Sequence, residues 1–340
     1  HRDLHKEYRR QRQMCIRDRY YKGLGTSTGK EFKEYFANKK MVYFQHNGEE
    51  SKNDIDKVFN KKRADDRKEW LSVYDRNAYL DTSKTSVTYE EFIHNDLRHF
   101  SKYDNDRSIP NLTDGLKISL RKILYSAFKK KLHYEIKVAQ FSGYVSEHSG
   151  YHHGEASLQG TIINMAQNYP GSNNIELLQP NGQFGTRLNG GKDRASERYI
   201  YTALSEITRC IYPEEDDNIL ENRTEDGTTI EPVYYAPIIP MILVNGTKGI
   251  GTGFSTHILN HSPEDIIESI KTKINGGSLK PGTLIPYYKN FKGTIFYNSG
   301  KYYIKGCYEV MSGNEIRITE LPIGTWTDDY KADLEYMISD

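Results

Sequence analysis

Cysteine and tryptophan are scarce in this sequence of 340 residues, with three and two copies respectively. The cysteines, Cys15, Cys210 and Cys307, lie far apart and lack the paired spacing of metal ligands. The chain also lacks an apolar run of about 18 residues and a signal-peptide pattern. We therefore expect a protein of a reducing compartment that is neither secreted nor partnered with a membrane.

A surplus of either charge sign is also missing, because the net charge is only +1. The charges are nonetheless segregated along the chain. Residues 107–137 carry eight Lys or Arg and two acidic residues, a local net charge of +6, whereas residues 214–231 carry eight acidic residues and one Arg. A basic block on a neutral protein indicates a local polyanion site. The alternative is a helix face that is merely solvated.

The first 19 residues, HRDLHKEYRRQRQMCIRDR, are dense in charge and nearly devoid of apolar side chains. The hexapeptide MCIRDR also resembles a translated sequencing adapter. We expect residues 1–19 to be an artefact or disordered, and the fold is predicted without them.

Two helices are predicted from their N-terminal caps in the first third of the chain. A Gly-rich turn within residues 19–36 leads to a helix capped by Ser27 or Thr28. Residues 88–106 form a second helix, since Thr88 and Glu91 have the spacing of a capping box. Between them, residues 46–68 are polar and predict a linker or an exposed helix.

A basic helix is predicted after Asp114, which would be its N-cap. Lys117 and Arg121 are four residues apart and would share its polar face. The apolar side chains at helical spacing are Leu116, Leu120, Ile123, Ala127 and Phe128.

Residues 137–169 contain two further helical patterns, separated by GYHHGE. Two short helices joined by a Gly-containing turn beside a basic helix indicate a helix-turn-helix or winged-helix unit. From Tyr212 onward, short β-branched and aromatic runs alternate with turn residues and predict strands. The fold class is therefore α+β. The predicted buried side of the second helix is Leu158, Ile162, Met165 and Ala166.

The segment GKDRASERYIYT places Arg198 directly before Tyr199 and puts Lys192 and Arg194 close by. A tyrosine hydroxyl with a pKa of about 10 is a poor nucleophile near neutral pH. Adjacent cations favour the phenolate and stabilise the charge that develops on an attacked phosphodiester. The pattern therefore fits a covalent phosphotyrosine mechanism, although an Arg-Tyr pair is also common as an ordinary surface or packing pair.

Several long motifs occur in an order that resembles the type IIA DNA topoisomerases of the eukaryotic kind. The segment 177–202, LLQPNGQFGTRLNGGKDRASERYIYT, is similar to the active-site region of that family, and the similarity extends over residues 20–340. The other segments that carry it are YYKGLGTST, DNDRSIPNLTDGLK, KVAQFSGYVSEHSGYHHGEASL, PIIPMILVNGTKGIGTGFS and ITELPIGTWTDDYK.

The resemblance implies a domain order and a set of site residues. Residues 20–75 would be the C-terminal edge of a Toprim α/β domain with a linker, 76–212 a winged-helix DNA-cleavage domain, and 213–340 an incomplete α/β tower domain. Tyr199 would be the nucleophile that becomes linked to a DNA 5′ end, with Arg198 as the catalytic arginine beside it. The residues that would bind DNA or support cleavage are Arg107, Lys117, Arg121, His152, His153 and Lys192; for the two histidines, ordinary hydrogen bonds in a turn are the alternative.

Ile250 lies in the Gly-rich segment NGTKGIGTG and falls on the wedge residue of the resembled family. An exposed apolar side chain on such a tip can enter between base steps and kink a duplex. The neighbouring glycines would let the backbone approach DNA closely. A nucleotide-phosphate loop is disfavoured, because the segment lacks the Lys-Ser/Thr ending of a P-loop and the strand–helix setting of a Rossmann site.

The same resemblance implies Mg²⁺ and ATP as cofactors of the full-length enzyme, with the residues that bind both expected outside this chain. Asp104 and Asp106 form a D-x-D pair that we interpret as structural, so no metal ligand is predicted. The expected partners are double-stranded DNA and a second copy of the chain, in the nucleus of a eukaryote or in the virion or host cytoplasm of a large DNA virus. A fragment truncated at both ends would cleave DNA poorly on its own. A non-catalytic winged-helix module and an inactive gene fragment remain the alternatives.

Overall fold

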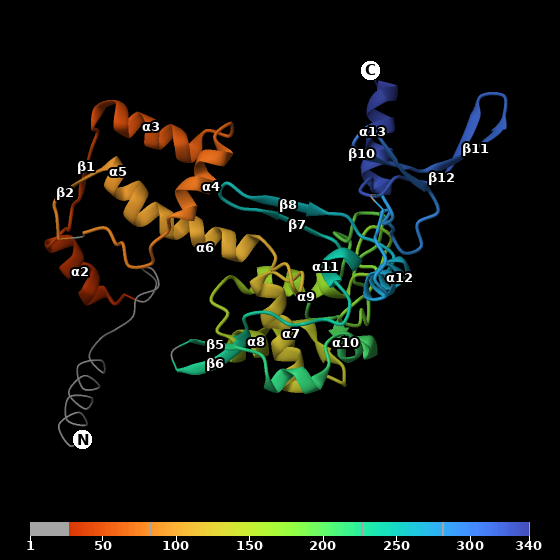
Figure 1. Ribbon diagram of the computed structural model, residues 1–340, viewed down its shortest axis with the longest axis horizontal. Helices are drawn as coiled ribbons and strands as arrows, with labels where there is room; N and C mark the ends of the chain where they lie inside the picture. The colour runs from red at the N-terminus through yellow and green to blue at the C-terminus, as the bar shows by residue number, and fades with distance from the viewer. Residues whose placement is uncertain (1–26, 82, 226, 281, 340) are drawn as a thin grey trace. The chain divides into compact units, whose positions relative to one another are not determined.

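The computed structural model describes residues 27–81, 83–225, 227–280 and 282–339 (Figure 1). The chain divides into two compact units, one comprising the residues up to 59 with 75–97, the other 60–74 with 98–340. Helices and short strands are mixed throughout, which confirms the α+β class. The predictions for residues 1–19 and for the turn that precedes Thr28 lie outside the described residues.

The first unit consists of short elements whose ends carry the predicted caps. Thr28 and Glu31 form a capping box at the start of α2, and Thr88 and Glu91 form another at α5, so both caps are confirmed. Strands β1 and β2 pair in parallel. The bounds are α2 Gly29–Ala37, β1 Tyr43–Gln45, α3 Gly48–Phe59, β2 Ser86–Thr88, α5 Tyr89–Phe92 and the π-helical turn η2 Ile93–Leu97.

The second unit is built around α7 (Ile118–Lys130), which contacts α8 (Val138–Ser149) and α9 (Glu155–Ala166). These are the basic helix and the two helices that the sequence predicts, and their apolar sides form the core. Within it Ile123, Ala127, Leu158 and Ile162 are fully buried. Burial of such a side chain contributes roughly 1.5–3 kcal/mol. The helices α4 (Ala64–Ser72) and α6 (Arg98–Ser108) belong to the same unit.

The start of α7 differs from the prediction. The N-cap is Lys117, which provides no side-chain hydrogen bond, and not Asp114. The Asp114 carboxylate is instead fully buried and accepts from the Leu116 N–H at 2.9 Å and from the Arg121 guanidinium at 2.7 and 3.0 Å. The ion pair with the buried Arg121 guanidinium is stronger than the hydrogen bond that the carboxylate would accept as an N-cap.

The remainder of the second unit consists of antiparallel strand pairs and short helices. The hairpins after Tyr212 agree with the strand patterns predicted there, whereas the pair formed by residues 136–137 and 201–202 lies before Tyr212 and joins segments far apart in sequence. The pairs are β3 with β4, β5 with β6, β7 with β8, β9 with β10 and β11 with β12. Their bounds are β3 Ile136–Lys137, β4 Tyr201–Thr202, α10 Glu206–Ile211, η3 Glu214–Asn218, β5 Asn222–Glu225, β6 Thr228–Pro232, α11 Met241–Val244, β7 Thr247–Ile250, β8 Ser255–Ile258, α12 Pro263–Ile274, β9 Thr294–Asn298, β10 Lys301–Lys305, β11 Cys307–Ser312, β12 Glu315–Glu320 and α13 Thr327–Ser339. No helix in the described ranges is both long and apolar enough to span a membrane.

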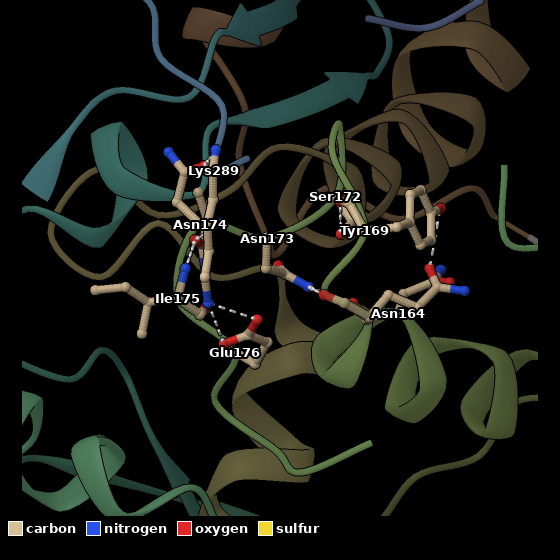
Figure 2. A network of polar contacts seen from close by, with 10 residues as sticks. Asn164, Tyr169, Ser172, Asn173, Asn174, Ile175, Glu176 and Lys289 are labelled. Carbon is tan, nitrogen blue, oxygen red and sulfur yellow. Dashed lines mark hydrogen bonds and ion pairs between the residues drawn. The ribbon is translucent and has the colours of Figure 1, made fainter. Parts of the chain in front are cut away.

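A buried asparagine fixes the root of the β7–β8 hairpin (Figure 2). The Asn174 amide nitrogen lies 3.0 Å from the carbonyl oxygens of Val244, His261 and Tyr287. Its amide oxygen accepts from the Lys289 N–H at 2.9 Å. Because buried polar groups need partners, this one side chain ties together backbone groups from segments that are far apart in sequence and that flank the β7–β8 hairpin.

The loop that precedes Tyr199 is fastened to the C-terminal part of the unit. Gly190 has a φ of 59°, and a Cβ atom there would lie 2.3 Å from the Trp326 ring. The Arg187 guanidinium binds the Glu320 carboxylate and the Leu321 carbonyl. Glycine is therefore required at 190 both for the left-handed backbone and for contact with the indole.

Candidate nucleic-acid interface

Tyr199 lies in the irregular segment that leads into β4. Its side chain is 69% exposed, whereas Ile200 beside it is 1% exposed. The Ile200 carbonyl accepts from the Val138 N–H at 3.0 Å, and the Glu197 carbonyl accepts from the Ala139 N–H at 3.1 Å. The first N–H groups of a helix have no partner within it. The N-terminus of α8 therefore anchors the backbone on both sides of Tyr199 while the phenol projects outward.

The Arg198 guanidinium lies beside the phenol ring of Tyr199. Its guanidinium carbon lies 5.4 Å from the centre of the Tyr199 ring, within the range of a cation–π contact. The Tyr199 hydroxyl makes no hydrogen bond with any residue that the structure describes, so it is free to meet an incoming group. The structure thus brings the predicted nucleophile and its arginine together; their catalytic roles stay predictions.

Lys192 and Arg194 add positive charge to the same segment, and both are exposed. The carboxylate of Asp193, between them, accepts hydrogen bonds from the Thr186 N–H at 2.9 Å and from the Thr186 hydroxyl at 2.5 Å. A Cβ atom at Gly160 would lie 3.9 Å from the Arg194 guanidinium, so this cation extends toward α9. Neither cation has an ion-pair partner within the described ranges, so both groups are open to an anion.

A polar hollow of about 500 Å³ is lined by Arg107 and Lys117 together with residues of α9. Burial lowers the pKa of the Lys117 ammonium, because a charge withdrawn from water without a counter-ion is destabilised. Thr161 and Asn164 of α9 contribute to the lining, as does Lys248, and the lining contains no acidic side chain. The predicted phosphate contacts Arg107 and Lys117 are therefore brought together.

Arg121 does not share this surface, and the prediction that it lies on one face with Lys117 is wrong. Its side chain is 3% exposed and its guanidinium is held by Asp114 and by the Leu116 carbonyl. Such a group is unavailable to a phosphate, so Arg121 supports the helix start from within. Lys117 and Arg121 are indeed four residues apart, but this spacing does not reveal that Arg121 pairs with the buried Asp114 carboxylate.

His152 and His153 are exposed in the loop between α8 and α9 and are held by different elements. The His152 Nε2 atom lies 2.8 Å from the Glu225 carboxylate of β5. The His153 Nε2 atom lies 2.7 Å from the Tyr103 hydroxyl of α6. Ordinary hydrogen bonds, the alternative weighed from the sequence, are thus present, and a DNA-contact role for either ring stays a prediction.

Ile250 ends β7 with its side chain 70% exposed, as a wedge residue would be. Two of the glycines around it make room for a neighbouring helix, and the expected close approach of this segment to DNA stays a prediction. A Cβ atom at Gly249 would lie 2.3 Å from the Ser108 carbonyl oxygen, and one at Gly251 would lie 2.1 Å from the Asn105 side chain. The close approach is therefore between β7 and α6, which lie side by side in Figure 1.

Substitution of Gly249 by Ala should lower the free energy of unfolding by about 1–3 kcal/mol, because the added methyl group overlaps a backbone carbonyl. The matched control is Gly143→Ala in α8, where nothing lies within 4 Å of the new Cβ atom. That change should stabilise the protein by about 0.5–1 kcal/mol through helix propensity. Urea unfolding measures both changes, and equal effects would contradict the contact between β7 and α6.

No group of three or more His, Cys, Asp or Glu side chains in the described part of the chain is arranged to hold a metal ion. The predicted structural role of the D-x-D pair agrees with its contacts. Asp104 accepts from the Ser108 hydroxyl at 3.2 Å, and Asp106 pairs with Lys102.

Sequence reasoning missed Lys248 and the α9 side chains that line the hollow. Lys248 stands two residues before Ile250, so strand periodicity could have placed both on one face. Thr161 and Asn164 carry no charge pattern, and only the fold brings them to the lysines.

Residues 107–340 match the family of the DNA gyrase/topoisomerase IV A-subunit. Residues 4–105 match the C-terminal associated domain of TOPRIM. Two relatives are named DNA topoisomerase 2. The protein from Bombyx mori is 51% identical over 92% of this chain, and the one from Arabidopsis thaliana is 51% identical over 95%. The chain spans only 21% and 22% of their lengths.

A solved structure agrees with these matches. The DNA-binding, cleavage and re-ligation domain of Plasmodium falciparum topoisomerase II superimposes with a TM-score of 0.78 at 50% identity, over 94% of this chain and 44% of that one. The family match covers more than half of the sequence and includes Tyr199 and the cationic hollow. The chain belongs to the DNA gyrase/topoisomerase IV A-subunit family, and hence to the type IIA DNA topoisomerases that its motifs resemble.

Proposed function

We propose that this chain is the DNA-binding and cleavage core of an ATP-dependent type II DNA topoisomerase. The observation that carries the proposal is the Tyr199 hydroxyl, exposed and unbonded beside the Arg198 guanidinium. The cleavage, passage and rejoining of duplexes by the whole enzyme form part of the same proposal.

The proposed step exchanges one phosphodiester for another. The Tyr199 oxygen gives up its proton to solvent and attacks the phosphorus, forming a P–O bond. The bond from phosphorus to the 3′ oxygen breaks, and that oxygen leaves as a 3′ hydroxyl after taking up a proton. The 5′ phosphate stays on the tyrosine. Arg198 is positioned to stabilise charge on the phosphoryl oxygens, and rejoining is the reverse reaction, which needs no ATP.

Mg²⁺, ATP and a second protomer belong to the proposal for the whole enzyme. The residues of this chain that the structure describes do not fit a metal, since they contain no cluster of ligands. This chain therefore contributes the nucleophile and its cations. Cutting both strands of a duplex requires two copies of Tyr199, so we propose a homodimer.

A non-catalytic winged-helix module would keep the cationic hollow but would have no use for the tyrosine. The exposed phenol among unpaired cations favours the enzyme. The deciding experiment is the capture of a covalent DNA adduct on Tyr199, with a complete Toprim domain supplied by fusion.

Binding of duplex DNA by the full 340-residue chain should depend steeply on salt. Lys117→Gln should reduce the slope of log K against log salt by about 0.9, the value for one phosphate contact. Fluorescence anisotropy over a salt series measures the slope. An unchanged slope would remove Lys117 from the interface, and weak, salt-independent binding by the wild-type chain would contradict the proposed interface itself.

A further inference from the structure

We propose that Lys248 is an additional DNA-phosphate contact that holds the duplex backbone beside the step entered by Ile250. The proposal rests on the proposed function, because it assumes that the interface binds a duplex. It goes beyond that function because Lys248 is not among the predicted DNA contacts. It also links the cationic hollow to the wedge residue Ile250, since Lys248 and Ile250 both lie on β7.

The strand geometry sets Lys248 and Ile250 on one face. Successive side chains of a strand point to opposite sides, and Gly249 between them is buried against the Ser108 carbonyl of α6. The face of β7 opposite α6 therefore carries Lys248 and Ile250, and both are exposed. The register pairs Lys248 with His257 and Ile250 with Ser255, so no acidic side chain lies directly across the hairpin from either.

The position of Lys248 is fixed from both ends of the strand. At the root, the Asn245 side chain accepts from the N–H groups of Asn174 and Ile175 at 3.0 and 2.9 Å. At the tip, the Asn105 amide of α6 donates to the Thr252 carbonyl at 3.0 Å. Because both ends are held, β7 presents its outer face as a rigid platform, which lowers the cost of ordering on binding.

The charge around Lys248 points to an anion. It lines the same hollow as Arg107 and Lys117, and none of the three cations has an ion-pair partner in the part of the chain that the structure describes. The rest of the lining is neutral and includes Thr161, Asn164 and Asn173. Three unpaired cations around amide and hydroxyl groups favour a chain of phosphates, since such groups bind phosphate oxygens without reading sequence.

A phosphate held by Lys248 would lie beside the base step that Ile250 enters, where the duplex is kinked. Insertion of an apolar wedge unstacks a base step and bends the duplex, at a cost of a few kcal/mol. Contacts that form only on the bent duplex offset this cost. Lys248, two residues before Ile250, is placed to make such a contact.

The test compares Lys248→Gln, Lys248→Arg and Ile250→Ala in the full chain, on a short duplex with a fluorophore at each end. Anisotropy gives the salt slope, and energy transfer between the fluorophores gives the bend. Lys248→Gln should lower the slope by about 0.9, so that between about 50 and about 200 mM salt its affinity falls roughly 3.5-fold less than that of wild type. Lys248→Gln should also reduce the bend. Lys248→Arg, which keeps the positive charge, should leave the salt slope and the bend near their wild-type values. Ile250→Ala should reduce the bend without changing the salt slope.

The matched control is Lys273→Gln, an exposed lysine in the last turn of α12, which should change neither readout. If Lys248→Gln leaves slope and bend at wild-type values while Lys117→Gln lowers the slope, the assignment of Lys248 is wrong and the proposed function stands. If neither substitution changes the slope, the proposed DNA interface fails as well. A lower slope with an intact bend would overturn the link between Lys248 and the wedge.

Discussion

Tyr199→Phe should abolish the covalent protein–DNA adduct, lowering its yield by at least about a thousandfold, as removal of a nucleophile does in other covalent enzymes. The reason is that phenylalanine keeps the ring and its contact with the Arg198 guanidinium, 5.4 Å away, and removes only the attacking oxygen. The measurement is denaturing gel analysis of end-labelled duplex after the reaction is stopped with detergent. The protein carries a complete Toprim domain and is supplied with Mg²⁺.

Tyr201→Phe is the matched control for this experiment. Tyr201 lies two residues along the chain, is 36% exposed, and has the Lys137 ammonium 6.0 Å from its ring centre. It is therefore another accessible phenol beside a cation. Because Tyr201→Phe leaves the proposed attacking oxygen in place, we expect the adduct yield to stay near the wild-type level. Trapping that survives Tyr199→Phe and disappears with Tyr201→Phe would assign the chemistry to the wrong tyrosine.

Asp114→Ala should cost about 3–5 kcal/mol of stability, the range for breaking a buried ion pair. The Asp114 carboxylate is fully buried and accepts from the Arg121 guanidinium, the Leu116 N–H and the Tyr235 N–H. Its loss leaves a buried positive charge and two backbone donors without partners. Urea unfolding, followed by a signal from the second unit, measures the change.

Two comparisons separate burial from charge in this prediction. Asp106→Ala removes a carboxylate that is 50% exposed and paired with Lys102, and it should cost less than about 1 kcal/mol. The double substitution Asp114→Ala with Arg121→Met should recover part of the loss, because no unpaired charge remains. An Asp114→Ala protein as stable as the Asp106→Ala protein would show that the pair does not anchor α7.

The parts of the fold predicted correctly from sequence are those that local chemistry determines. Thr88 and Glu91 form the predicted capping box, and Thr28, one of the two predicted caps of the first helix, caps α2. The apolar spacing that ends in Phe128, and the Gly-containing turn before Glu155, locate α7, α8 and α9. These signals are strong because each depends on neighbours within one or two helical turns.

The incorrect and missing assignments depend on contacts between residues far apart in sequence. Asp114 has the chemistry of an N-cap, but Arg121 and the Tyr235 N–H compete for its oxygens. Gly249 makes room for α6, a contact that the sequence pattern does not reveal. Lys248 was overlooked because a single lysine in a Gly-rich segment gains meaning only beside Arg107 and Lys117. Tertiary packing decides each case.

The backbone on either side of Tyr199 is bonded to the first N–H groups of α8. This has a mechanical consequence for a broken strand. A DNA end esterified to the phenol would be tethered to a helix and not to a free loop, so the gap between the cut ends would change only when the whole helix is displaced. The cut ends would then be realigned for resealing by the movement of the helices as rigid bodies, because each DNA end moves with the helix to which it is tethered.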